Sequence, residues 1–268
     1  MLPYRLAAVD LDDTLLGPDK EISAANHAAI HRLLNAGVKV VLASGRRHEN
    51  MRRYHKQLDL PDSLIVSCNG ALVMDDRSGE VLHERLLPAD LAAAIIEEGE
   101  RRRATQQFYH LRGALYVNHK NEWTRLYETR TQNNLVLCPD ISGLASEPLL
   151  KILWVMPPAD VLAHFPTLRE RFADSLYVTI TDPEYLEFMA IGVNKAAGIA
   201  LAAERYGVAP AEVITFGDGN NDVEMLEWAG LGIAMDHARE AAHRAADRVA
   251  PPGDPETGFA RAVDMLFS

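Results

Sequence analysis

The most informative segment of the chain is Leu6-Ala7-Ala8-Val9-Asp10-Leu11-Asp12-Asp13-Thr14. Its first four residues are apolar, which is typical of a short buried strand. Asp10 and Asp12 follow at the end of that strand, and residues two apart lie on the same face of an extended chain. Like charges held this close need a cation or a proton between them. The segment therefore predicts divalent-metal and phosphate chemistry, although Asp12-Asp13-Thr14 is also compatible with a simple turn or helix cap.

Size and composition limit the classes of protein to consider. The 268 residues suffice for one large domain or two small ones, and an apolar share of 48% is ordinary for a globular core. The formal net charge of −11 argues against a nucleic-acid partner, which would favour a basic face. Cys68 and Cys138 suggest neither a disulfide framework nor a metal site. With no signal peptide or membrane-spanning run apparent, we expect a cytoplasmic protein without a membrane partner, and the sequence does not indicate an oligomeric state.

Helix and strand patterns alternate after the first strand. A helix is predicted at residues 23–36 with Ser23 as its N-cap, and strands are predicted at 38–43 and 64–67 on either side of a helix at 47–58. This order favours a parallel, doubly wound sheet. Near Leu87-Pro88 the pattern changes to α+β with adjacent antiparallel strands, and parallel features return near Val193. We therefore predict an α/β fold in which residues 1–86 and 190–268 form a mostly parallel, Rossmann-type core and residues 87–189 form an inserted α+β domain.

Three further polar motifs lie at predicted strand ends or helix starts. Ser44 follows the second strand, and its hydroxyl can donate to a phosphoryl oxygen without adding charge. Lys195 opens a helix, whose N-terminus suits a phosphate that the ammonium group would share. The loop Gly217-Asp218-Gly219-Asn220-Asn221-Asp222 follows another strand and offers the hard oxygen ligands that Mg²⁺ prefers. Taken singly, these features are also explained as a cap, a surface lysine and a glycine-rich loop. In a parallel sheet, however, they would meet at one edge.

Together these motifs resemble those of the haloacid dehalogenase superfamily, in the same order. The matching residues are Asp10-x-Asp12-x-Thr14, Ser44, Lys195 and Gly217-Asp218-x-x-Asn221-Asp222. The long insertion, Ser44-Gly45-Arg46 and Asn69-Gly70-Ala71 resemble the Cof-type branch, which carries a large class IIB α/β cap. The likeness covers essentially the whole chain. Asp13 and Ala196 stand where the family most often has glycine, which affects the loop and the local helix packing.

The resemblance implies a phosphomonoester hydrolase that acts on small metabolites such as sugar phosphates, FMN or pyridoxal phosphate. Asp10 would attack phosphorus and form an aspartyl-phosphate. Asp12 would protonate the leaving oxygen and then take a proton from the attacking water. The resemblance also implies a Mg²⁺ ion held by Asp10, Asp218 and the backbone carbonyl of Asp12.

The resemblance assigns supporting roles to the remaining motif residues. Substrate phosphate would be bound by Ser44, Gly45, Lys195, Asn221 and the N–H groups that begin at Leu11. Thr14 and Asp222 would support the site, with Asp222 orienting Lys195 or a metal-bound water. The inserted cap would select the leaving group.

Three alternative functions share parts of this pattern. A receiver-type phospho-acceptor domain also uses clustered aspartates, a hydroxyl and a lysine, but it would be about half this length and would place its acceptor on a later strand. A phosphomutase with a related core would return the phosphoryl group to a sugar instead of to water. A catalytically idle relative would bind a phosphorylated metabolite without turning it over.

Overall fold

The computed structural model describes residues 2–267, which form two compact units. The core unit comprises the residues up to 83 and those from 194 onward, and the inserted unit comprises residues 84–193. The sequence analysis placed these two boundaries at 86/87 and 189/190. A mostly parallel core with an inserted α+β unit is the predicted fold class, and this prediction is confirmed.

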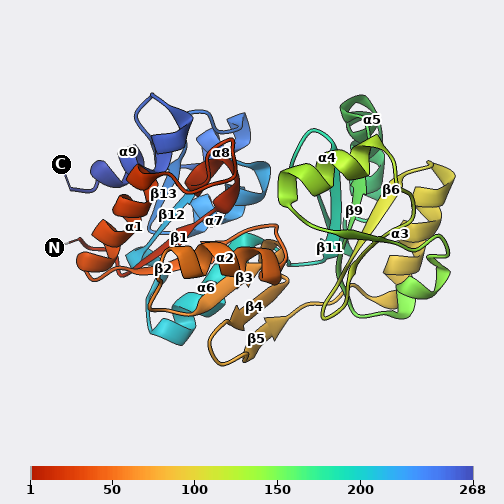
Figure 1. Cartoon of the computed structure of the whole chain (residues 1–268), viewed down its shortest axis with the longest axis horizontal. Coiled ribbons are helices and arrows are strands. Elements are labelled where there is room, and N and C mark those ends of the chain that lie inside the picture. The colour runs from red at the N-terminus through yellow and green to blue at the C-terminus, as the bar shows by residue number, and fades with distance from the viewer. Residues whose placement is uncertain (1, 268) are drawn as a thin grey trace. The chain divides into compact units, whose positions relative to one another are not determined.

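The core unit is built on an eight-stranded sheet of order β14-β13-β12-β1-β2-β3-β4-β5 (Figure 1). All pairings from β14 to β3 are parallel, and β3 pairs with β4 in the antiparallel sense. The sequence analysis did not predict β4, β5 or β14. The strands are β1 (Leu6–Val9), β2 (Lys39–Ala43), β3 (Leu64–Ser67), β4 (Leu72–Asp75), β5 (Val81–Glu84), β12 (Val213–Gly217), β13 (Leu231–Ala234) and β14 (Arg248–Val249).

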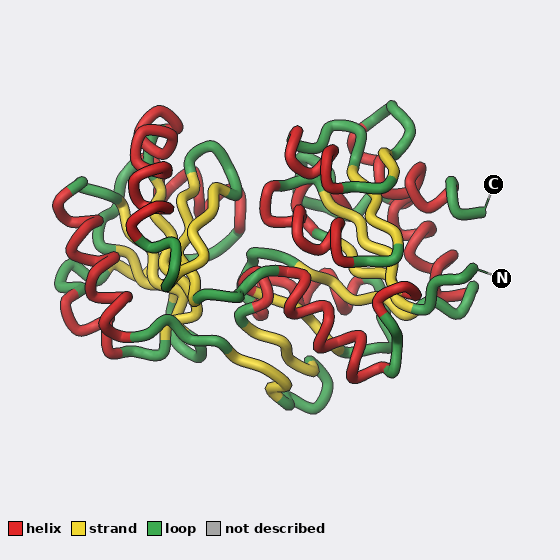
Figure 2. Tube along the Cα trace, turned by 180° about the vertical axis from the view of Figure 1, so that it is seen from behind, coloured by secondary structure: helices red, strands yellow, loops and turns green. Residues whose placement is uncertain are grey.

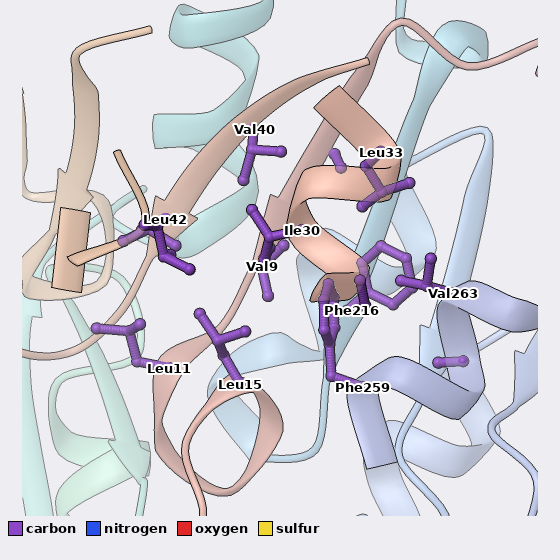
Figure 3. Close-up of a cluster of buried hydrophobic side chains, with 14 of the residues drawn as sticks. Val9, Leu11, Leu15, Ile30, Leu33, Val40, Leu42, Phe216, Phe259 and Val263 are labelled. Carbon is purple, nitrogen blue, oxygen red and sulfur yellow. The ribbon is translucent and has the colours of Figure 1, made fainter. Parts of the chain in front are cut away.

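Helices cover both faces of this sheet because successive side chains of its strands point to opposite faces. Val9 and its neighbours on one face pack against α1, α2 and α9, as Figure 3 shows for Ile30, Phe216 and Phe259. Leu6 and the residues on the other face pack against α6 and α7. The helices are α1 (Ala24–Asn35), α2 (His48–Gln57), α6 (Lys195–Tyr206), α7 (Val223–Trp228), α8 (Glu240–Ala245) and α9 (Gly258–Asp264). Ser23 caps α1, as predicted, by accepting a hydrogen bond from the backbone of Asn26.

The inserted unit contains a six-stranded sheet of order β10-β11-β9-β6-β7-β8. Its pairings are antiparallel except that between β7 and β8. Helices α3 and α5 pack on one face around Trp154 and Phe188, whose ring centroids are 4.7 Å apart. Figure 2 shows the strands of each unit with helices around them. The elements are α3 (Ala89–Arg101), β6 (Thr105–His110), β7 (Leu115–Val117), α4 (Glu122–Thr131), β8 (Leu135–Leu137), β9 (Leu149–Val155), α5 (Pro158–Arg171), β10 (Leu176–Ile180) and β11 (Tyr185–Ala190).

The register of the three central strands of the core sheet brings three chain segments to one edge. Val9 is paired with Leu42 of β2 on one side and with Phe216 of β12 on the other. Because these strands are parallel, the residues that follow each of them emerge at the same carboxyl edge of the sheet. Asp10, Ser44 and Asp218 are therefore delivered to one place.

Within residues 2–267, no helix combines the length and the apolar character needed to cross a bilayer.

Candidate active site

The turn after β1 presents the first carboxylates. Leu11–Leu15 form a single π-type turn in which Leu11 and Leu15 are buried among the apolar side chains of the core unit (Figure 3). Asp12 has an extended backbone, and Asp13 has a left-handed one with φ of 59°. Aspartate is among the few residues other than glycine that adopt this conformation readily. Glycine, which is usual at this position in the resembled family, adopts the same backbone conformation readily.

Helix α6 delivers Lys195 to the same edge. The side chain of Asn194 caps the helix by accepting a hydrogen bond of 2.8 Å from the backbone of Ala197. Lys195 is buried, and its ammonium group donates to Asp10 and, at 2.6 Å, to Asp222. Burial alone would lower the pKa of Lys195, but the two carboxylates outweigh it and raise that pKa above its usual value. Lys195 is therefore a fixed positive charge between two aspartates.

Asp222 organises the loop after β12. One of its carboxylate oxygens accepts from Lys195, and the other accepts from the backbone N–H groups of Asp218 at 3.0 Å and Gly219 at 2.8 Å. A β-carbon at Gly217 would lie 2.6 Å from the Asp222 side chain, so a glycine is needed where the loop folds back. Both oxygens of Asp222 are thus committed to hydrogen bonds, one to Lys195 and the other to the backbone of the loop.

Asp10, Asp218 and Asp222 form an acidic group in which one carboxylate oxygen from each residue lies within 4.8 Å of the other two. Burial, followed by the charges of Asp222 and Asp12, raises the pKa of Asp10 to about 8 against the opposing effect of Lys195. Burial and the charges of Asp10 and Asp222 also raise the pKa of Asp218 well above its ordinary value. Lys195 contacts Asp10 and Asp222, and a third carboxylate this close to them is unfavourable unless a further cation or a proton compensates its charge.

The carboxylate oxygens of Asp10 and Asp218 could hold a divalent cation between them. Thr14 donates to one oxygen of Asp218 at 2.8 Å, and Lys195 donates to one oxygen of Asp10. Among residues 2–267, no hydrogen-bond donor reaches the second oxygen of either carboxylate. Two free carboxylate oxygens are a typical protein contribution to a Mg²⁺ site, which keeps several waters.

Asp12 lies apart from this acidic group, because its carboxylate is bound by two cations. Arg46 donates to both carboxylate oxygens at 2.7 Å, and Lys20 lies 3.2 Å from one of them. Burial opposes ionisation of Asp12, but Arg46 and Lys20 prevail and lower its pKa to about 2. Both oxygens of the Asp12 carboxylate are therefore engaged by cations, and a role for its backbone carbonyl in metal binding stays a prediction. The sequence analysis assigned no role to Arg46 or Lys20, although Arg46 lies in the motif Ser44-Gly45-Arg46.

The remaining predicted phosphate-binding residues lie on neighbouring loops of the core unit. Ser44 is buried, and its hydroxyl accepts a hydrogen bond of 3.2 Å from the backbone of Arg46. Asn221 donates to the side chain of Asn69 at 2.9 Å. A β-carbon at Gly45 would lie 3.0 Å from the same Asn69 oxygen. The sequence analysis gave Asn69 no site role, and its only signal was the motif Asn69-Gly70-Ala71.

Comparison with known proteins places this arrangement in a family context. The sequence model of the haloacid dehalogenase-like hydrolases matches residues 7–263. The 5-amino-6-(5-phospho-D-ribitylamino)uracil phosphatase YitU of Bacillus subtilis is 30% identical over 99% of this chain and 98% of its own length. The HMP-PP phosphatase of Serratia proteamaculans is 29% identical over 88% of this chain and 85% of its own. A haloacid dehalogenase-like hydrolase from Bacteroides thetaiotaomicron, with 27% identity, superposes with a TM-score of 0.85 over 98% of this chain and 100% of its own.

Proposed function

We propose a function from the premise that this chain belongs to the haloacid dehalogenase-like hydrolases. The proposed function is that of a Mg²⁺-dependent phosphatase that acts on small phosphorylated metabolites through an aspartyl-phosphate. The observation that carries the proposal is the placement of Lys195. Its ammonium group contacts Asp10 and Asp222, next to Asp218, at the carboxyl edge of the core sheet. This arrangement supplies a nucleophile, a fixed cation and carboxylate ligands for a metal within one small volume.

The residues divide the chemistry between them. Asp10 attacks phosphorus as the bond to the leaving oxygen breaks, and water later cleaves the aspartyl-phosphate. Lys195, Ser44 and the backbone N–H groups that begin at Leu11 hold the phosphoryl oxygens, with Gly45 and Asn221 completing the set. Mg²⁺ held by Asp10, Asp218 and the Asp12 carbonyl would neutralise charge between the nucleophile and the phosphate. Asp12 exchanges protons with the leaving group and with water.

The substrate class rests on the relatives and on the inserted unit. We propose substrates such as sugar phosphates, FMN, pyridoxal phosphate and the compounds named for the two relatives above. We also propose that residues 84–193 act as a cap that selects the leaving group, because the predicted reacting groups all belong to the core unit. Replacing these residues with the corresponding segment of a relative should change substrate preference while activity still depends on Asp10.

A cytoplasmic location is part of the proposal. Its support is that neither Cys68 nor Cys138 forms a disulfide, as is usual for thiols in a reducing compartment.

The test is a panel of phosphomonoesters assayed for release of inorganic phosphate, with Mg²⁺ and with a chelator. We expect Mg²⁺-dependent release from several members of the panel and its loss in Asp10→Asn, whose circular dichroism should match the wild type. Brief incubation with a good substrate and acid quenching should reveal a phosphorylated protein that hydroxylamine cleaves. Release of phosphate by Asp10→Asn at the wild-type rate would refute the assignment. A phosphomutase would instead return an isomeric phosphate ester without free phosphate.

A further inference from the structure

The carboxylate of Asp12 is held by Arg46 and Lys20, two cationic residues that the sequence analysis did not assign to the site. Arg46, in the turn after β2, donates from Nε to Oδ2 and from Nη2 to Oδ1, both at 2.7 Å. Lys20 lies in the short loop closed by the bridge between Leu16 and Ile22, and its Nζ is 3.2 Å from Oδ1. A paired contact between guanidinium and carboxylate fixes the plane of the carboxylate as well as its position.

Tyr54 of α2 supports both cations. The Tyr54 side chain is buried, and Nη1 of Arg46 donates to its hydroxyl at 3.4 Å. The same hydroxyl donates to the backbone carbonyl of Lys20 at 2.9 Å. The side chain of Arg46 is only 5% exposed and that of Asp12 is 38% exposed, so the guanidinium is fixed inside the protein while part of the carboxylate faces solvent. The three residues therefore form a rigid support for Asp12.

The contacts leave one direction open at Asp12. An ionised carboxylate has about four lone-pair sites. Arg46 uses one on each oxygen, and Lys20 uses a second on Oδ1. Among residues 2–267, no donor takes the remaining site on Oδ2.

We infer that Arg46 and Lys20 are positioning residues that hold Asp12 so that its Oδ2 exchanges the proton with the leaving group and with water. The inference rests on the proposed function. In the first half-reaction, an oxygen of Asp10 bonds to phosphorus and the bond from phosphorus to the leaving oxygen breaks. The ionised Oδ2 accepts the proton carried by the monoanionic form of the phosphate ester and passes it to the leaving oxygen, which departs as an alcohol. In the second, water bonds to phosphorus, the bond to Asp10 breaks, and Oδ2 takes the proton of the water. Both transfers need Oδ2 at the same place, and the two cations keep it there.

The test separates proton transfer from general damage by varying the leaving group. An alkyl phosphate such as a sugar phosphate needs a proton on its leaving oxygen, whereas p-nitrophenyl phosphate releases a weakly basic phenolate and needs little help. We expect Arg46→Met to lower kcat/KM for the alkyl ester by about 10²-fold, which is within the usual contribution of acid–base catalysis. For the p-nitrophenyl ester the loss in kcat/KM should be about ten times smaller. Lys20→Met should also lower kcat/KM more for the alkyl ester than for the p-nitrophenyl ester, but by smaller factors than Arg46→Met. Arg244→Met, which breaks an exposed Arg–Glu pair on α8, should match the wild type on both.

A double-mutant cycle with Asp12→Asn identifies the group through which Arg46 acts. Because Asp12→Asn can no longer transfer a proton, adding Arg46→Met to it should not lower kcat/KM any further. An additional loss in the double variant would show that Arg46 contacts the substrate itself and would overturn the inference. Equal losses for the two esters would overturn it as well.

A folding control keeps the test decisive. Arg46→Lys retains the positive charge without the paired contact, so it should show the same dependence on the leaving group. It can therefore replace Arg46→Met if that variant proves unstable. An active wild type whose Arg46 variants behave like Arg244→Met would refute this inference and leave the proposed function intact. A wild type that releases no phosphate from any ester would refute the proposed function, and the inference with it.

Discussion

At the scale of single residues, Asp222 shows how much the site depends on one buried carboxylate. It accepts hydrogen bonds from Lys195 and from two backbone N–H groups, and its side chain is 1% exposed. An amide in its place would direct an NH₂ group either at the ammonium of Lys195 or at the two backbone donors. Neither orientation satisfies the contacts, because an amide nitrogen does not accept hydrogen bonds.

We therefore predict that Asp222→Asn destabilises the protein and impairs turnover together. Breaking a buried ion pair from one side costs about 3–5 kcal/mol of unfolding free energy. Misplacement of Lys195 should lower kcat by about 10²-fold. Urea unfolding and steady-state kinetics measure the two effects. Asp264→Asn is the matched control because Asp264 pairs with Arg32 on the surface, and it should change the unfolding free energy by less than about 1 kcal/mol.

Gly70 connects a backbone requirement to the position of Lys195. It has a φ of +93°, and a β-carbon there would lie 2.3 Å from the carbonyl oxygen of Asn194, the residue that caps α6. Gly79 has a similar φ of +75° but no atom within 4 Å of such a β-carbon. We predict that Gly79→Ala costs only the backbone penalty of about 1–2 kcal/mol. Gly70→Ala should cost more and should also lower kcat, because the start of α6 must move. Equal stability and equal kcat in the two variants would contradict this account.

At the scale of elements, the hairpin of β4 and β5 depends on a carboxylate at its turn. Asp75 accepts hydrogen bonds from the hydroxyl of Ser63 at 2.6 Å and from the N–H groups of Arg77 and Ser78. Burial opposes the charge of Asp75, but these donors prevail and lower its pKa to about 2. The pKa in the folded state thus lies below that of an unfolded aspartate, about 3.9. The stabilisation from the ionised form is complete above about pH 4 and is lost as the pH falls toward 2.

We predict a pH-dependent difference between the wild type and Asp75→Asn. At neutral pH the variant should be less stable by on the order of 1 kcal/mol, because it loses charge-assisted hydrogen bonds at the turn. The difference should shrink as the pH falls from about 4 to about 3, because in this range the aspartate of the unfolded wild type, with its pKa of about 3.9, takes up a proton that the folded state does not. Urea unfolding over a pH series measures it, with Asp59→Asn on the exposed surface as the control. A difference that grows on acidification would show that the sign is wrong.

The elements that sequence analysis recovered are those with strong local signals. β1, β2 and β12 are apolar runs at the centre of the sheet, and α6 is a helix with a cap at Asn194 and a terminating glycine at Gly207. The two residues of β14 are exposed and carry no apolar pattern. β5 is only half-buried, so its alternation is weak. Strands at the edge of a sheet need less apolar surface than central ones, which is why sequence patterns find them poorly.

At the scale of the whole molecule, the site is assembled from segments that only the fold brings together. Motif order and strand ends predicted that Asp10, Lys195 and Asp218 would share one edge of the sheet, because parallel strands deliver their carboxyl ends to the same side. The contacts of Asp12 could not be predicted in this way. Lys20 reaches it from a surface loop and Arg46 from the turn after β2, and no local pattern relates either of them to Asp12.

We predict that the same assembly makes the stability of the molecule depend on metal, and that Asp218→Asn changes which of the two proteins, variant or wild type, is the more stable. Without metal, Asp218 is a buried carboxylate beside two others, and its raised pKa shows that its charge is unfavourable there. Replacing it with asparagine removes this repulsion and keeps an oxygen to accept from Thr14. In the presence of a chelator, the variant should therefore unfold at a temperature equal to or above that of the wild type.

Added Mg²⁺ should invert that order. A ligand at about 100 times its Kd stabilises the folded state by about 2.7 kcal/mol, so the wild type should gain several degrees in Tm. Asp218→Asn lacks one of the two free carboxylate oxygens and should gain little, so the two melting curves should cross as Mg²⁺ is raised. Asp264→Asn should follow the wild type at every concentration. Equal stabilisation of Asp218→Asn and the wild type would place the ion elsewhere in the protein. A variant that melts well below the wild type in chelator would show that the charge on Asp218 is already balanced without metal.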